Sequence, residues 1–387
     1  MGYMVNTLSL FTGCGGIDIG LERAGFNVVG CIEIEKYACD TVRLNHPNKV
    51  VIGPPNYLGD IRHVDEGLLA KTLPIRLSEI EFIVGGPPCQ PFSAASMQRY
   101  FKGDDKYKRK GFRDENLGTL LWEYFRVLKV ILPKCFLVEN VPDFVSGENK
   151  PEYDLFIKSV EELGYFTETK ILLASDYGVP QNRKRAFIIG WKSDVEVEFS
   201  FPEPTHFQHP VNGQKPKIGI AQALFGIDTK CINHVKRNHK PESIERYKTL
   251  AVGKRESKGR VDRLNPRLPG KTVIAGGKNG GGRSHLHPYE ARTLTPRESA
   301  RIQTFPDNYI LTGTIGRQFT QIGNAIPPLL GEVLGRKIAQ SFFGKQYDGS
   351  PSLMPSSLTV EGINTICSEV LKQSDKSMLY NDLKGTK

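Results

Sequence analysis

The segment LSLFTGCGGID, residues 8–18, has the pattern of a buried strand that ends in a glycine-rich turn and leads into a helix. Leu8 to Phe11 supply the apolar strand, and the residues from Ile17 to Ala24 follow a helical pattern. Glycines placed between a strand and a helix let the backbone approach a ligand closely. The segment therefore predicts the first strand–turn–helix unit of an α/β protein, with a ligand site at the turn.

The same alternation of strand and helix continues over the first 190 residues. Further strands are expected at 28–32, 81–84, 135–138, 166–173 and 186–189. Further helices are expected at 117–132 and 154–163. An alternation of this kind predicts a mostly parallel, doubly wound sheet.

The composition changes after Trp191. Residues 191–292 are basic, poor in long apolar runs, and interrupted by proline and glycine. They predict a separate, smaller domain. A helical pattern returns at 327–343 with one apolar face, which should pack back on the sheet. The large domain is therefore expected to be discontinuous, comprising 1–190 plus 293–344, with 345–387 as a polar tail.

Net charge suggests a polyanionic partner. The 387-residue chain carries a formal charge of +10, with a pI of about 9.1. Lys and Arg cluster in 97–113 and 230–263, two loop-like segments with interleaved aromatic residues. Two such segments favour a cleft around nucleic acid over a membrane face. No apolar run approaches the ~18 residues of a membrane span.

The cysteines indicate the compartment and argue against a structural metal. Seven cysteines are scattered along the chain without a C-x-x-C pair or a histidine cluster at zinc spacing. No metal is therefore expected. An odd, scattered count without a signal peptide is typical of a protein from a reducing cytoplasm.

The glycine-rich turn suggests a nucleoside cofactor that lacks a pyrophosphate. Gly13 and Gly15 begin a G-x-G-x-x-G pattern, but Asp18 stands where its last glycine would be. Glu33 follows Gly13 by twenty residues, at the end of the second strand, where an acid can bind both hydroxyls of a ribose. Together these residues point to S-adenosylmethionine, with a plain βα turn of an α/β protein as the ordinary alternative. The pair Asp60-Ile61 could read an adenine amino group and pack on its face.

A second candidate site is the loop around Cys89. The sequence Pro87-Pro88-Cys89 follows a short apolar strand and two glycines. Two prolines fix φ and remove two amide donors, so the loop cannot relax into helix or sheet. A cysteine is more often a small buried hydrophobic residue. On a rigid loop at a strand end, however, its thiol is placed as a nucleophile would be.

Two further groups carry charge at strand ends. Glu139 ends a fully apolar strand, where a carboxylate is costly unless it is paired or takes part in the chemistry. Arg183 and Arg185 alternate onto one face as the chain enters a later strand. Two guanidinium groups on one face suit a phosphate or a base carbonyl. A solvent-facing glutamate and a basic edge strand are the ordinary alternatives.

These pieces, in this order, resemble the C5-cytosine-specific DNA methyltransferase family of the bacterial restriction–modification type. The matching motifs are FTGCGG at 11–16, GPPCQPFS at 86–93, ENV at 139–141, QNRKR at 181–185, LTPRE at 294–298, QTFP at 303–306 and GNAIPP at 323–328. The resemblance implies a Rossmann-like methyltransferase domain. It also implies that 191–292 form a mostly irregular and β target-recognition domain inserted before the C-terminal helices.

The resemblance also implies roles for four residues. A thiolate that adds to C6 of cytosine makes C5 nucleophilic enough to accept a methyl group, and the family pattern makes Cys89 that thiolate. Glu139 would meet N3 and the exocyclic amine of the base, and Arg185 would donate to O2. Arg183 would help to position the base and the loop. The methyl donor would be S-adenosylmethionine.

Cofactor and DNA contacts follow from the same pattern. The residues implied to hold the cofactor are Phe11, Gly13, Gly15, Glu33, Ile34, Asp60, Ile61, Pro87, Leu120, Asn324 and Ala325. Those implied to contact DNA are Gln90, Ser93 and Thr272, with 94–116 as a lid. The partner would be double-stranded DNA from which the target base is flipped out. The expected protein is a monomer of the bacterial cytoplasm, associated with the nucleoid and linked in function to a restriction endonuclease.

Two alternatives within this fold remain. A tRNA cytosine methyltransferase would carry Cys-Phe-Thr in the recognition segment, whereas Cys231 is followed by Ile232. A non-catalytic DNA-binding relative would not need Cys89, Glu139 and both arginines. A zinc cytosine deaminase is excluded, because the second cysteine of its P-C-x-x-C motif is replaced by phenylalanine and no H-x-E lies nearby.

Overall fold

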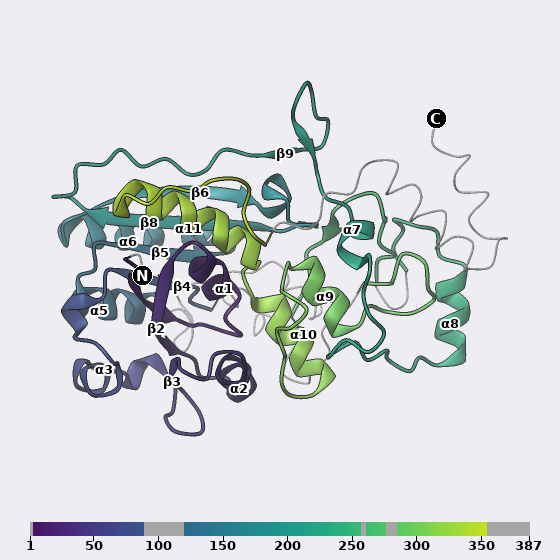
Figure 1. Cartoon of the computed structure of the whole chain (residues 1–387), viewed down its shortest axis with the longest axis horizontal. Coiled ribbons are helices and arrows are strands. Elements are labelled where there is room, and N and C mark those ends of the chain that lie inside the picture. Colours follow the sequence, from purple (N-terminus) through teal and green to yellow (C-terminus); the bar gives the residue numbers. More distant parts are fainter. Residues whose placement is uncertain (1–2, 89–119, 257–260, 276–284, 354–387) are drawn as a thin grey trace. The chain divides into compact units, whose positions relative to one another are not determined.

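The chain divides into two compact units (Figure 1), each described by itself. The computed structural model describes residues 3–88, 120–256, 261–275 and 285–353. The first unit comprises residues 1–173, 184–202 and 331–349, and the second comprises 174–183, 203–330 and 350–387. Within the described ranges, no helix combines the length and the apolar character needed to cross a bilayer.

The first unit is built on a seven-stranded sheet in the order β3-β2-β1-β4-β5-β8-β6. Its strands are β1 (Val5–Leu10), β2 (Phe26–Ile32), β3 (Val50–Ile52), β4 (Phe82–Gly85), β5 (Cys135–Asn140), β6 (Tyr165–Leu173) and β8 (Lys184–Lys192). All neighbouring pairs from β3 to β5 are parallel, whereas β8 is antiparallel to both β5 and β6. Because only residues 174–183 join β6 to β8, the chain must turn back rather than cross over. The predicted doubly wound, mostly parallel α/β fold is confirmed.

Helices alternate with these strands along the chain. They are α1 (Gly16–Arg23), α2 (Lys36–Asn45), α3 (Glu66–Thr72), α5 (Leu120–Ile131), α6 (Lys150–Glu162) and α11 (Pro328–Phe343). The sequence prediction contained α1, α5, α6 and α11 to within a few residues. It did not contain α2, β3 or α3.

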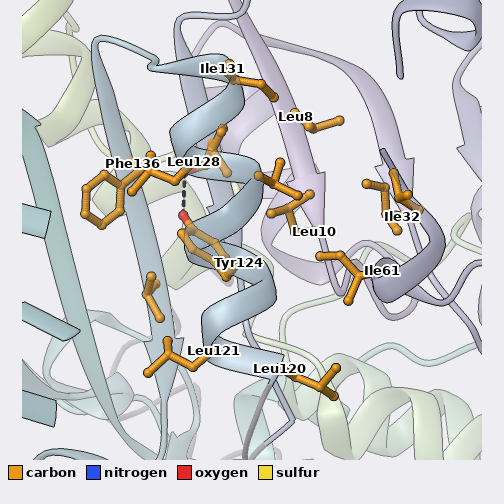
Figure 2. Packing of buried hydrophobic residues seen from close by; sticks show 14 of the residues in the cluster. Leu8, Leu10, Ile32, Ile61, Leu120, Leu121, Tyr124, Leu128, Ile131 and Phe136 are labelled. Atoms are coloured by element: carbon orange, nitrogen blue, oxygen red, sulfur yellow. Dashed lines mark hydrogen bonds between the residues drawn. The ribbon is translucent and has the colours of Figure 1, made fainter. Parts of the chain in front are cut away.

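Helix α5 places the main core against the sheet (Figure 2). Its buried residues recur at helical spacing and include Leu121, Tyr124, Leu128 and Ile131. The Tyr124 hydroxyl lies 3.3 Å from the carbonyl oxygens of both Ile83 and Leu137. This side chain therefore joins β4 to β5 while its ring fills the core.

Helix α11 packs against α1 through two glycines. A Cβ atom added to Gly331 would lie 3.0 Å from the Ile17 carbonyl oxygen, and one added to Gly335 would lie 2.8 Å from the Ala24 Cβ. The predicted apolar face of α11 is buried, with Phe342 5.8 Å from the Trp191 ring on β8. The return of this helix to the sheet is confirmed.

The second unit contains short elements joined by irregular chain. β7 (Gln181–Asn182) pairs with β11 (Gly270–Lys271), and β9 (His206–Phe207) pairs with β10 (Lys215–Pro216). Its helices are α7 (Ile220–Leu224), α8 (Pro241–Lys248), α9 (Pro296–Ile302) and α10 (Ile315–Asn324).

The boundaries of these units differ from the predicted domains at several places. Residues 174–183, expected with the sheet, group with the second unit, and residues 191–202, expected in the smaller domain, group with the first. Residues 293–330, expected with the sheet, group with the second unit. In that unit the Arg297 amide donates to the Asn233 carbonyl at 3.0 Å. Residues 345–349, expected in the tail, belong to the first unit, where the Tyr347 hydroxyl donates to the Ala24 carbonyl at 2.6 Å. The roles assigned to the segments remain predictions.

Candidate active site

The turn after β1 is a left-handed loop with an open face. Phe11, Gly13 and Gly15 have φ values of 53°, 58° and 76°, a region that glycine enters at little cost and phenylalanine does not. The Thr12 hydroxyl lies within donating distance (3.1 Å) of the Ser9 carbonyl, and the Gly15 amide donates to the Thr12 carbonyl, also at 3.1 Å. A Cβ atom on Gly13 would meet nothing within 4 Å. The space beside the Gly13 backbone is thus open where the sequence predicts a ligand.

Glu33, at the end of β2, lies against this loop. Its carboxylate accepts from the Gly13 amide at 2.7 Å and from the Glu35 amide at 2.8 Å. Burial raises the pKa of Glu33, and amide donors including those of Glu35, Gly13 and Ile34 partly offset the effect. The structure therefore brings together the glycine turn and the acid that the twenty-residue spacing had paired, with the carboxylate held in one orientation.

The residues that flank Glu33 complete this region. Ile34 is 58% exposed, which is high for an isoleucine and fits a side chain that a bound ring would cover. Gly59 packs on the Glu33 carbonyl so closely that a Cβ atom there would lie 2.0 Å from the oxygen. This contact places the turn that carries Asp60 beside Glu33.

Asp60 and Ile61 are more engaged than the sequence suggested. The Asp60 carboxylate accepts from the Arg62 guanidinium at 2.6–3.2 Å, which lowers the pKa of Asp60. An adenine amino group would have to share this carboxylate with Arg62. Ile61 is 3% exposed and belongs to the core, so little of its side chain is free to pack on an adenine ring. Leu120 of α5 is buried in the same cluster, against which Phe11 packs.

The chain after β4 is fastened to the end of β5. A Cβ atom on Gly86 would lie 3.0 Å from the Glu139 Oε2 atom. The buried Asn140 side chain donates to the Pro87 carbonyl at 3.1 Å and accepts from the Val141 amide at 2.9 Å. The start of the predicted nucleophile loop is therefore held in place. Cys89, Gln90, Ser93 and the predicted lid at 94–116 lie outside the described residues.

Glu139 and Arg185 form an ion pair across β5 and β8. The Arg185 Nε atom lies 2.9 Å from Glu139 Oε1, and the two side chains are 14% and 11% exposed. Within the described part of the chain, Oε1 lacks an aligned hydrogen-bond donor. The contact is thus an ion pair whose carboxylate keeps capacity for another partner. This ion pair compensates for the unfavourable burial of a carboxylate at the end of β5.

Arg183 has different surroundings, in the second unit. It is 2% exposed and donates to the Gly323 carbonyl at 3.0 Å and, more weakly, to the Asn324 carbonyl at 3.5 Å. Arg183 therefore meets the turn that carries the predicted cofactor residues Asn324 and Ala325. Thr272 lies in the same unit, and its hydroxyl donates to the Asn182 carbonyl at 2.8 Å.

Comparison with known proteins identifies the family. The model of the C-5 cytosine-specific DNA methylase family matches residues 5–340.

The chain belongs to the C-5 cytosine-specific DNA methylase family.

Named relatives agree with this assignment. The chain is 31% identical to the Type II methyltransferase M.NgoFVII of Neisseria gonorrhoeae over 83% of each chain. It is 32% identical to the Type II methyltransferase M1.HphI of Haemophilus parahaemolyticus over 86% of each chain. A crystal structure assigned as a DNA modification methyltransferase encoded within an E. coli prophage superposes with a TM-score of 0.70 at 23% identity, covering 88% of this chain and 100% of the other. That likeness confirms the fold.

Four of the five described thiols of this DNA methylase are poor candidates for a nucleophile. Cys14, Cys31, Cys39 and Cys135 are buried. Burial raises the pKa of Cys39 to about 12 and raises the pKa of the other three as well. Such thiols stay protonated at neutral pH, which is consistent with a nucleophile elsewhere in the sequence.

Sequence reasoning missed residues that fix the candidate loops and turns within each unit. Asn140 lies inside a quoted motif, but only its contact with Pro87 gives it a role. Gln181 and Gln303 also lie in quoted motifs, and the structure joins them by a 2.9 Å hydrogen bond. The sequence signal that could have identified these residues is an amide side chain at an otherwise buried position of a motif.

Proposed function

We propose that this methylase transfers a methyl group from S-adenosylmethionine to C5 of a cytosine flipped out of double-stranded DNA. The Glu139–Arg185 pair carries the proposal, because it sets a carboxylate and a guanidinium 2.9 Å apart at the end of β5. Cytosine offers matching groups on one edge, with N3 and the amine facing a carboxyl group and O2 facing a guanidinium. Family membership supports the reaction.

The protein supplies the nucleophile and the proton partner. The Cys89 thiolate forms a bond to C6, which removes the aromaticity of the ring and leaves C5 nucleophilic. Glu139, sharing a proton with N3, balances the charge that develops on the ring, and Arg185 donates to O2. Once C5 has accepted the methyl group, water removes the C5 proton, the Sγ–C6 bond breaks and the thiolate is restored.

S-adenosylmethionine, when bound, supplies the electrophilic methyl group. Its adenosine would be held by Glu33 at the ribose hydroxyls and by Phe11 and Ile34 at the base. The fit is supported by the oriented carboxylate of Glu33, the open backbone at Gly13 and the 58% exposure of Ile34.

Replacing Glu33 with glutamine should weaken S-adenosylmethionine binding by about 10- to 100-fold. Both Glu33 oxygens accept from backbone amides, so the new NH2 group must face one of those donors. The charge available to the ribose hydroxyls is also lost. Isothermal titration calorimetry measures the change. Because burial raises the pKa of Glu33, affinity should also fall with acidification from a higher pH than an ordinary glutamate would show.

Glu35 provides the matched control. Its carboxylate caps α2 by accepting from the Tyr37 and Ala38 amides. Glu35→Gln makes the same chemical change two residues away and should leave the affinity within about twofold. Equal losses in both variants would remove Glu33 from the ribose site.

Named Type II relatives support a role in protecting host DNA from a restriction endonuclease. In this proposal the enzyme is a monomer that acts in the bacterial cytoplasm on nucleoid DNA and needs no contact with the nuclease. Thr272, Gln90 and Ser93 would contact the DNA.

A comparison of duplex DNA and tRNA as methyl acceptors tests the proposal against its alternatives. The purified chain should transfer tritiated methyl groups from S-adenosylmethionine to duplex DNA and leave total tRNA unlabelled. Label in tRNA alone would favour the tRNA methyltransferase. DNA binding without label in either polymer would favour a non-catalytic relative.

A further inference from the structure

The end of α10 is capped by side chains that are distant in sequence. The last four carbonyls of an α-helix lack the usual i+4 partners, and here they belong to residues 322–325. Gln303 donates through one nitrogen to the Ile322 carbonyl at 2.7 Å and the Ala325 carbonyl at 3.4 Å. Arg183 donates to the two carbonyls between them. Two buried side chains thus serve all four carbonyls.

Gln303 is itself held by a second buried amide. The Gln181 Nε2 atom donates to Gln303 Oε1 at 2.9 Å, and Gln181 Oε1 accepts from the Val273 amide at 2.8 Å. Both glutamines are fully buried. A backbone N–H begins this chain of hydrogen bonds and backbone carbonyls end it, so only one orientation of each amide satisfies every group. We call the pair Gln181 and Gln303 the amide relay.

The segment at the start of the relay also contacts the same turn directly. A Cβ atom on Gly323 would lie 2.2 Å from the Ala275 nitrogen, so the two backbones pack without space for a side chain. The Thr272 hydroxyl fastens the segment to β7 at 2.8 Å. Residues 272–275 and 322–325 are therefore joined both by the relay and by backbone contact.

We infer that Gln181 and Gln303 are positioning residues that couple the DNA-recognition segment 272–275 to the cofactor turn 323–325. The inference rests on the proposed function, which gives Thr272 to DNA, and on the family resemblance, which implies that Asn324 contacts S-adenosylmethionine. A displacement of Val273 shifts Gln181 through their hydrogen bond, and Gln181 in turn shifts Gln303. The carbonyls beside Asn324, which Gln303 holds, are displaced as a result. Breaking the relay at either glutamine disturbs the cofactor turn.

Calorimetric titration with S-adenosylmethionine tests the coupling in Gln303→Met, Gln181→Met and the double variant. Methionine keeps the length of the side chain and removes its hydrogen bonds. Gln303→Met should raise the Kd for S-adenosylmethionine about 10-fold. The hydrogen bonds of Gln181 go to Gln303 and Val273, so its effect on the cofactor turn is indirect. Gln181→Met should nevertheless raise Kd about fivefold. The double variant should match Gln303→Met, because the second change breaks a relay that is already broken.

Gln318→Met is the matched control, since Gln318 lies on the same helix and donates to the Gly313 carbonyl at 2.9 Å. Its Kd should not change. Steady-state kinetics separate positioning from unfolding: a positioning role raises KM for S-adenosylmethionine with little change in kcat. A loss of folded protein would lower kcat at unchanged KM.

An unchanged Kd in Gln181→Met, or effects that simply multiply in the double variant, would overturn the relay while leaving the proposed function intact. Failure of the unsubstituted chain to bind S-adenosylmethionine would overturn the proposed cofactor, and the relay with it.

Discussion

The Cys89→Ala variant is expected to lose methyl transfer to DNA, by on the order of 10⁴-fold or more, while it still binds S-adenosylmethionine. Without the thiolate no bond forms to C6, and C5 stays too weak a nucleophile to accept a methyl group. Cofactor affinity should persist because the described cofactor candidates, Glu33 and Gly13, hold each other independently of the thiol. Transfer is measured with tritiated methyl groups and binding by calorimetry.

Cys231→Ala is the control for loss of a thiol. Cys231 is a free, partly exposed cysteine whose thiol donates to the Asp307 carbonyl at 3.9 Å. This variant should retain full activity. Methyl transfer by Cys89→Ala at even a tenth of the normal rate would show that the reaction does not pass through a covalent bond to Cys89.

Glu139→Gln should lower kcat by about 10²- to 10⁴-fold with little change in the affinity for S-adenosylmethionine. An amide cannot share a proton with N3, and it leaves the Arg185 guanidinium without its ionic partner. Arg185 approaches Glu139 to 2.9 Å, so the substitution also loosens the group expected to hold O2. Single-turnover rates at saturating cofactor measure the chemical step.

Glu332→Gln makes the same change at another buried ion pair of the first unit. Glu332 is fully buried and pairs with Arg336 at 2.8 Å on α11. We expect a lower melting temperature in this variant but a normal kcat. If both substitutions lowered kcat equally, Glu139 would be acting through stability and not through the reaction.

Sequence patterns identified the strands whose two faces are buried. β5 is buried at every position and reads as an unbroken apolar run up to Glu139. The helix α2 was missed because its pattern is weakly apolar and its start depends on Glu35, whose side chain accepts from two amides of the first turn. β3 has three residues and is defined by its pairing with β2. The sequence alone does not reveal such a pairing.

The sequence predicted those parts of the candidate site in which two residues are separated by a fixed number of positions. Gly13 and Glu33 follow the βαβ geometry, so their separation in sequence predicted their contact. The cap that Arg183 places on α10 could not be predicted, because its acceptors lie 140 and 141 positions away in the chain. Asp60 was a candidate from its position, but its pairing with Arg62 appears only when the turn is folded.

The most direct test is bisulfite sequencing of genomic DNA from a methylation-free bacterial host that expresses the chain, beside a host that expresses Cys89→Ala. The account predicts cytosines methylated in one defined sequence context with the unsubstituted chain, and unmodified cytosines with the variant. That context would also supply the recognition sequence. Uniformly unmodified cytosines in both hosts, with the protein folded and able to bind S-adenosylmethionine, would contradict the account.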